Sequence, residues 1–270
     1  MAVGLTPSVA LASQTIEPTA DARWRALAGT APQATIFHHP EWLSLLGEQY
    51  GYEILACLVV DEHHQPVAGL PLAIVRSRLT GSRLVALPFS DACPPLVATG
   101  AQAEATAALC SGLDSLRRSQ GLALEVRHAV ELDAASVVPS YHQHVLELEG
   151  GDPVGERARP AARRGVRKAR REGVAIERRT DAEALDAFYR LHLRTRRRQG
   201  VPTQPRRFIR AFSGLFERGL GFVMLARLGS RAIAAAVFVG DGRTLTYKYG
   251  ASDLAYLCLL YTSPSPRDKS

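Results

Sequence analysis

The chain has 270 residues, of which 46% are hydrophobic and 22% charged. These proportions fit a globular protein with one large or two small domains, and they exclude a collagen-like chain, a disordered tail and a disulfide scaffold. No apolar run reaches the ~18 residues of a transmembrane helix, so we expect none. The first basic residue is Arg23, so the N-terminus lacks the charged region of a secretory signal and we expect a cytoplasmic protein.

The net charge is +7, which permits nucleic acids, phosphorylated substrates or acidic lipids as partners. Metal and redox sites need closely spaced ligands, and neither the cysteines nor the histidines provide them. We therefore expect free buried thiols and no metal site. The residues considered are Cys57, Cys93, Cys110 and Cys258, and the adjacent pairs His38-His39 and His63-His64.

The first half of the chain mixes helical and strand patterns after an N-terminus, residues 1–18, that we expect to be ragged. Apolar spacing and turn residues predict two short helices, an antiparallel three-stranded meander, a longer helix ended by Gly121 and two further strands. In chain order these elements cover residues 21–28, 37–46, 52–60, 67–75, 83–87, 101–119, 122–126 and 141–148.

The second half begins with a helix near Pro160 and continues with a helix that a capping box at Thr180–Glu183 starts and Gly200 ends. A third helix is followed by another meander, whose last two strands are joined by the two-residue turn signal Asp241-Gly242. These later elements are predicted at residues 206–218, 221–228, 232–239 and 244–249.

Both halves therefore place helices before a three-stranded meander, which indicates two α/β domains, 1–150 and 151–256, joined at residues 150–153. The first copy continues with a helix and a strand, whereas the second ends soon after its meander. Residues 257–270 lack any period and resemble translated sequencing-adapter sequence; an ordinary disordered C-terminus is the alternative. We expect a non-native tail, an incomplete second domain and an open edge at strand 244–249.

The helix near Pro160 carries six cations. At 100° per residue they occupy about half of the circumference, and small residues that fit closely against a sheet fill the rest. Six like charges repel one another, so we predict an anion here: a phosphate-bearing substrate, a tRNA backbone or a nucleotide pyrophosphate. A solvated charged face is the alternative. The cations are Arg163, Arg164, Arg167, Lys168, Arg170 and Arg171.

A second basic cluster ends the next helix, where the helix dipole favours cations in any case, so a solvated face is again the alternative. It consists of Arg194, Arg196, Arg197 and Arg198. The stretch Arg170-x-x-Gly173-x-Ala175 matches an acyl-CoA pyrophosphate loop, but it lies between a helix and a strand rather than between a strand and a helix. Gly173 is therefore predicted to end the basic helix.

The last predicted strand contains Tyr247, Lys248 and Tyr249. Alternation in a strand places both tyrosines on one face and Lys248 on the other. We predict that a phenol or the ammonium binds a substrate carboxylate or phosphate, although packing on the sheet is the better explanation for at least one tyrosine.

Several stretches together resemble the FemAB-related, BioF-like branch of the GNAT acyltransferase superfamily. The resemblance covers about residues 35–255 and rests on Phe37–Trp42, Leu87-Pro-Phe-Ser-Asp91, the basic helix, Thr195–Gly200 and Tyr247–Asp253. It implies tandem GNAT-like domains with mostly antiparallel mixed sheets flanked by helices. The family's C-terminal lysine motif has no counterpart here, so the resemblance assigns no catalytic residue.

The resemblance implies transfer of an acyl or aminoacyl group to an amine in cell-envelope or exopolysaccharide biosynthesis, with acyl-CoA or aminoacyl-tRNA as co-substrate and no bound cofactor. The partner would be an anionic small molecule or a peptidoglycan-type substrate, with tRNA as a further partner. Asp91 and Asp253 are carboxylates that could accept the amine's proton or could cap turns. The alternative function is a non-catalytic module that binds an anionic ligand or tRNA through the basic helix.

Overall fold

The computed structural model describes residues 10–79, 81–100, 102–128, 130, 132, 135–136, 142–148 and 158–260. The chain forms two compact units: residues 1–136 with 240–244, and residues 137–239 with 245–270. The domain limits expected from the sequence, 1–150, 151–256 and 257–270, stay a prediction. No helix among the described residues is long and apolar enough to cross a membrane.

The first unit is built on a mixed sheet with the strand order β1-β2-β3-β4-β6, and β5 pairs with β3. β2, β3 and β4 form the predicted antiparallel meander, while β6 runs parallel to β4. The strands are β1 (Ala12–Ile16), β2 (Glu53–Val60), β3 (Pro66–Ser77), β4 (Gly81–Val85), β5 (Leu96–Val97) and β6 (Ala123–Glu125).

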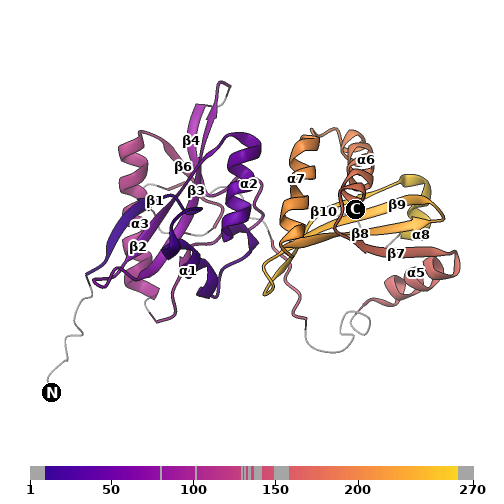
Figure 1. Cartoon of the computed structure of the whole chain (residues 1–270), viewed down its shortest axis with the longest axis horizontal. Helices are drawn as coiled ribbons and strands as arrows, with labels where there is room; N and C mark the ends of the chain where they lie inside the picture. The colour runs from indigo at the N-terminus through magenta and orange to yellow at the C-terminus, as the bar shows by residue number, and fades with distance from the viewer. Residues whose placement is uncertain are drawn as a thin grey trace, which may run out of the picture. The chain divides into compact units, whose positions relative to one another are not determined.

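Helices cover both faces of this sheet, and Figure 1 shows α2 and α3 on opposite sides of it. The side chain of Asp21 caps α1, Pro40 is the first residue of α2, and Gly51 and Gly121 end α2 and α3 with positive φ. These local signals explain why the helices were predictable. The helices are α1 (Ala22–Thr30), α2 (Pro40–Tyr50) and α3 (Gln102–Gln120), with a 3-10 turn, η1 (Ile36–His38), before α2.

Two expectations for the first half of the chain are wrong. Residues 12–16, expected to be ragged, form β1, which pairs antiparallel with β2 from Ile16 opposite Ala56 to Ala12 opposite Val60. The short polar sequence of β1 lacks a strand pattern. β1 is extended because it hydrogen-bonds to the edge of β2, which would otherwise be unpaired. Conversely, residues 142–148 form no strand and are exposed; residue 141 lies outside the described residues.

The second unit has a four-stranded sheet with the order β10-β9-β8-β7. β10 is the end strand of this sheet as described, which agrees with the expected edge. The turn between β9 and β10 spans residues 241–244, so the prediction of a two-residue turn is wrong: Asp241 accepts from the backbone N–H groups of Arg243 and Thr244. The strands are β7 (Val174–Arg179), β8 (Gly221–Leu228), β9 (Arg231–Gly240) and β10 (Leu245–Ser252).

Four α-helices and a 3-10 turn complete the described part of the second unit. α6 and α7 lie over one face of the sheet in Figure 1, and both contact β8. Their phenylalanines are buried, as are Val223, Leu225 and Val237 of the sheet. The side chain of Asp181, rather than that of Thr180, caps α6. The elements are α5 (Pro160–Arg171), α6 (Ala182–Gln199), α7 (Arg206–Glu217), η2 (Leu254–Tyr256) and α8 (Leu257–Leu260), and residues 261–270 of the expected tail lie outside the described residues.

His38 is fully buried in the first unit, and its hydrogen bonds fix its tautomer. The backbone N–H of Thr35 donates to Nδ1 over 3.0 Å, so the ring hydrogen lies on Nε2, which donates to the carbonyl oxygen of Pro94 over 2.9 Å. Burial lowers the pKa of His38 from 6.5 to about 4. His38 therefore serves the fold as a neutral linker between η1 and the segment that contains Pro94.

We expect this histidine to make the first unit acid-sensitive. Because the pKa is lowered on folding, the unfolded chain binds the proton first as the pH falls below 6.5, and the free energy of unfolding then decreases by roughly 3 kcal/mol down to pH 4. His38→Gln should remove that part of the pH dependence in urea titrations at pH 7, 5.5 and 4. If the free energy of unfolding fell equally with pH in the original protein and in the His38→Gln variant, this role of His38 would be wrong.

Candidate functional site

All of the basic residues predicted on the helix after Pro160 lie on α5, and every one is exposed. α5 contacts β7, an edge strand of the sheet, and α8, but none of its residues is buried, so its small-residue face is covered only in part. Arg164, Arg167, Lys168, Arg170 and Arg171 make no ion pair with any residue that the structure describes. Gly173 follows α5 with φ 81° and leads into β7, as predicted.

Other arginines of the second unit are neutralised by carboxylates. Arg179 donates to Asp181 over 2.6 Å, and Asp186 pairs with both Arg206 and Arg210. The guanidinium of Arg210, followed by that of Arg206, lowers the pKa of Asp186 to about 2. Such paired arginines hold elements together, whereas Arg164, Arg167, Lys168, Arg170 and Arg171 are available to an external anion.

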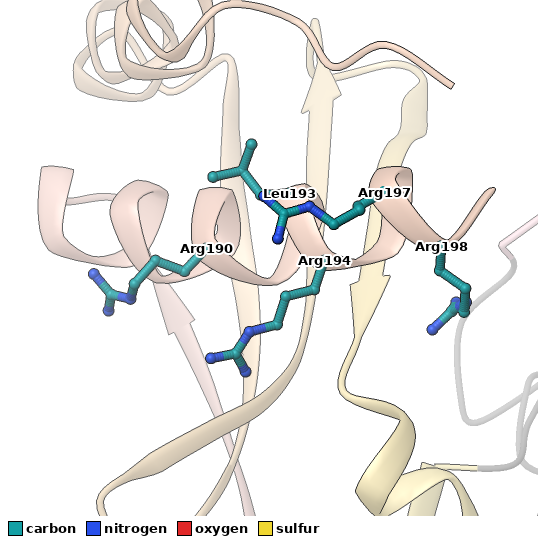
Figure 2. Close-up of a pocket in the computed structure, with 5 residues that line it drawn as sticks. All are labelled: Arg190, Leu193, Arg194, Arg197 and Arg198. Carbon is teal, nitrogen blue, oxygen red and sulfur yellow. The ribbon is translucent and has the colours of Figure 1, made fainter. Parts of the chain in front are cut away.

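The exposed side of α6 carries a pocket of about 480 Å³ lined almost entirely by cations. Figure 2 shows guanidinium groups spread along the helix, with Arg190 and Arg194 extending to the same side. Of these arginines, only Arg194 makes an ion pair within the described part of the chain. The lining residues are Arg190, Leu193, Arg194, Arg197 and Arg198.

Sequence reasoning found this surface only in part. Arg194, Arg197 and Arg198 belonged to the predicted second cluster, but Arg196 does not line the pocket and Arg190 was missed. The spacing of Arg190, Arg194 and Arg197 by four and three residues places them on one helical face, which is the signal that identifies the surface.

Asp253 joins α6 to the end of β10 through ion pairs. Its Oδ2 lies 3.2 Å from Nη1 of Arg194 and 2.9 Å from Nη2 of Arg231, and its Oδ1 accepts from the backbone N–H of Ala255. The Ala255 N–H and then the Arg231 guanidinium hold the pKa of this carboxyl below its usual range. Asp253 therefore caps η2 and pairs with two arginines in its charged form.

Two hydrogen bonds of Thr195 also hold α6 against the end of β10. The hydroxyl of Thr195 lies 3.4 Å from both the backbone N and the carbonyl oxygen of Ser252, so it can accept from one and donate to the other. The backbone N–H of Asp253 also donates to the carbonyl oxygen of Ile233 on β9 over 2.9 Å. The basic side of α6 is therefore held in register with the end of the sheet.

The two tyrosines of β10 do not share a face as predicted. Tyr249 is 8% exposed and its ring packs against Phe188, His192 and Phe212 under the helices. Tyr247 is 61% exposed and contacts Phe238, whose neighbours Val237 and Val239 point toward the helices instead. A Cβ at Gly250 would overlap the Tyr247 hydroxyl, so the glycine lets this ring lie along the strand.

Of the three residues predicted on β10, Tyr247 is therefore exposed, while Tyr249 supports the core. Lys248 is half-buried, and its Nζ lies 5.2 Å from the centre of the Tyr249 ring. On the buried face of α6, burial lowers the pKa of His192, which favours the neutral ring. Nε2 of His192 forms a hydrogen bond with Oε1 of Gln204 over 3.0 Å. Among the described residues, no group of three or more His, Cys, Asp or Glu side chains could hold a metal ion.

Comparison with known proteins finds a family match in the second half of the chain. Residues 156–259 match the family model described as an acetyltransferase (GNAT) domain. No significant match was found among curated protein sequences.

The whole chain also has a structural relative. It is similar to the crystal structure of FemX, with a TM-score of 0.66 and 14% identity over 92% of this chain and 82% of the other. A weaker similarity, TM-score 0.37 and 11% identity over 86% of this chain and 28% of the other, is to a GCN5-related glucosamine N-acetyltransferase region of a fungal multi-domain beta-N-acetylglucosaminidase.

The chain is thus a mixed α/β protein that carries a GNAT acyltransferase domain. Its fold as a whole is similar to that of FemX, which confirms the predicted fold class, and the match over residues 156–259 agrees with the predicted GNAT-type acyltransferase.

The different positions of the two tyrosines can be tested by truncation. Tyr249→Ala should lower the free energy of unfolding by about 3–5 kcal/mol, as expected for a buried aromatic residue, and Tyr247→Ala by less than about 1 kcal/mol. Urea unfolding followed by circular dichroism would measure both values. Equal losses would contradict the assignment of the two rings to different environments.

Proposed function

We propose that the protein is an N-acyltransferase that moves an acyl or aminoacyl group from an activated donor to an amine and holds an anionic part of one co-substrate at the α6 pocket. The observation that carries this proposal is the pocket itself: four guanidinium groups around about 480 Å³ in a GNAT domain, with three of them unpaired among the described residues. Arginine is the side chain best suited to phosphate and carboxylate groups, because its donors form a planar fork.

The chemistry requires a neutral amine and donors for the oxyanion that forms when the amine attacks. Cations near the reacting carbonyl favour both, since they lower the pKa of an ammonium group and stabilise negative charge. Asp253 pairs with Arg194 on the pocket side of α6, and its hydrogen bond to the Ala255 N–H and its pairing with Arg231 favour the charged form of this carboxyl. We therefore propose that Arg190, Arg197 and Arg198 bind the anion and that Arg194 is held in position by Asp253.

Either acyl-CoA or aminoacyl-tRNA has the phosphates that such a pocket would bind, and GNAT domains as a class favour acyl-CoA. The FemAB-related resemblance favours an acceptor amine on a peptidoglycan-type or exopolysaccharide precursor. Tyr247 and Lys248 are proposed to contact the same substrate from the end of the sheet, because both side chains are at least partly accessible.

The α5 cations leave a second candidate function open. All of them are exposed, and Arg164, Arg167, Lys168, Arg170 and Arg171 make no ion pair with a described residue, which favours a protein that binds an anionic partner through α5 with or without transfer. In a binding module, affinity would be measurable while no acylated amine would form. An assay for the acylated amine therefore distinguishes the enzyme from the binding module.

The test is acyl transfer by the purified chain, with acyl-CoA or aminoacyl-tRNA as donor and amine acceptors, followed by mass spectrometry of the acceptor. We expect an acylated amine, and we expect Arg197→Gln to raise the KM for the phosphate-bearing co-substrate about tenfold, the effect of one lost charge-assisted bond.

Arg207→Gln provides the matched control, because Arg207 is exposed on α7 and has no ion pair with a described residue. It removes the same charge outside the pocket and should leave KM within about twofold. Binding of donor and acceptor without product would favour the non-catalytic module, and equal effects of the two substitutions would exclude the α6 pocket as the anion site.

A further inference from the structure

We propose that α5 is a docking surface for a membrane bilayer rich in anionic lipids. This proposal names the partner of α5 and does not depend on transfer activity. α5 has 12 residues and a length of about 18 Å at 1.5 Å per residue. Its six cations fall within about 160° of arc on the helical wheel, and none of its residues is buried. The helix thus presents a convex, outward-facing cationic surface.

Five of the α5 cations have no ion-pair partner among the described residues: Arg164, Arg167, Lys168, Arg170 and Arg171. Lys168 lies four residues from Arg164, Arg171 lies four residues from Arg167, and such like-charged pairs destabilise a helix. The helix dipole offsets this cost only in the last turn. An external array of negative charge would stabilise the whole face.

The side-chain chemistry of α5 indicates what kind of anion this is. Beyond its cations, α5 contains only proline, alanine, glycine and valine, so it has no hydroxyl, amide or aromatic side chain to contact a sugar, a 2′-hydroxyl or a base. Outward-fanning cations also do not converge on one small anion. A bilayer surface, whose charged headgroups move laterally, requires only charge, and four to eight Lys or Arg residues on one helix are typical of anionic-lipid binding.

The other side of α5 determines how deeply the helix would bind. It carries Ala161, Ala162, Gly165, Val166 and Ala169, and Val166 is 43% exposed. Helices that insert into the headgroup region use Trp, Phe or Leu on this side, so α5 would adsorb electrostatically without insertion. The binding should therefore depend steeply on salt and on the fraction of anionic lipid.

The test is co-sedimentation of the full chain with vesicles of phosphatidylcholine alone or with about 30 mol% phosphatidylglycerol. We expect binding only to the anionic vesicles and release at about 0.5 M salt. Replacing Arg164, Arg167 and Lys168 together by Gln should weaken binding roughly 100-fold, at about fivefold per cation. The three side chains are exposed, so the circular dichroism spectrum and melting temperature should not change.

The matched control replaces Arg190, Arg197 and Arg198 by Gln, which removes the same charge from α6. This variant should bind anionic vesicles within about threefold of the original protein, whereas equal losses in both triple variants would overturn the assignment to α5. Replacing Arg164 and Arg167 by Lys should preserve binding, since charge alone is needed. A large loss with lysine would indicate bidentate recognition of a specific phosphate and would overturn the proposal.

Folded RNA is the competing partner and gives a distinct result. If a tRNA-sized RNA binds with an affinity that falls in the α5 variant, while anionic vesicles do not bind, the lipid proposal is wrong and α5 contacts a nucleic-acid backbone. A failed transfer assay with intact vesicle binding would overturn the proposed enzyme and leave this inference standing. If the protein transferred acyl groups but did not bind vesicles, the lipid proposal would be overturned and the proposed enzyme would stand.

Discussion

The functional surface of the second unit depends on the fixed register between α6 and the end of β10. Tyr249 fills the space beneath α6, the Thr195 hydroxyl bonds to both backbone groups of Ser252, and Asp253 joins Arg194 to Arg231. On the β10 side these contacts come from Tyr249, Ser252 and Asp253, which lie close together in the sequence. A shift of one residue in β10 would break all of them, because alternate residues of a strand face opposite sides.

The distribution of carboxylates decides which arginines are structural. Asp186, Asp253 and Asp181 each neutralise at least one guanidinium close to the sheet or between α6 and α7. No described carboxylate pairs with Arg190, Arg197 or most of α5. A net charge of +7 is therefore not spread evenly, and the second unit concentrates its unpaired positive charge on two helices. Unpaired cations gathered on one surface attract anionic partners, which is why their distribution, more than the net charge, indicates a binding function.

Strong local signals made most of the fold predictable from the sequence. Asp21, Pro40 and Gly51 mark the ends of their helices, and the β-branched and apolar runs of β2, β3, β8 and β9 were found within a few residues. Elements defined by distant partners were not predictable: β1 exists because β2 offers it an edge, and the different environments of Tyr247 and Tyr249 follow from packing against Phe238 and Phe188.

The candidate site was predictable to the extent that helical spacing reveals a charged face. The α5 cations could be placed on one side of a helix from sequence, because the 100° rotation per residue is independent of tertiary structure. The pairing of Arg194 with Asp253 spans 59 positions, and no local pattern indicates it. For the same reason, sequence alone could not separate Arg190, which lines the pocket, from Arg196, which does not.

Strand β1, which the sequence does not predict, limits how far the N-terminus of the protein can be shortened. α3 crosses β1 and β2 so closely that a Cβ at Gly112 would approach Ser13 and the sulfur of Cys57 to under 3 Å. Removing the first 16 residues would leave a hole beneath that glycine and an unpaired hydrogen-bonding edge along β2. A shortened form that begins at α1 would then tend to associate edge to edge. The smallest self-contained first unit therefore starts before Ala12, in a stretch that composition alone would have marked as dispensable.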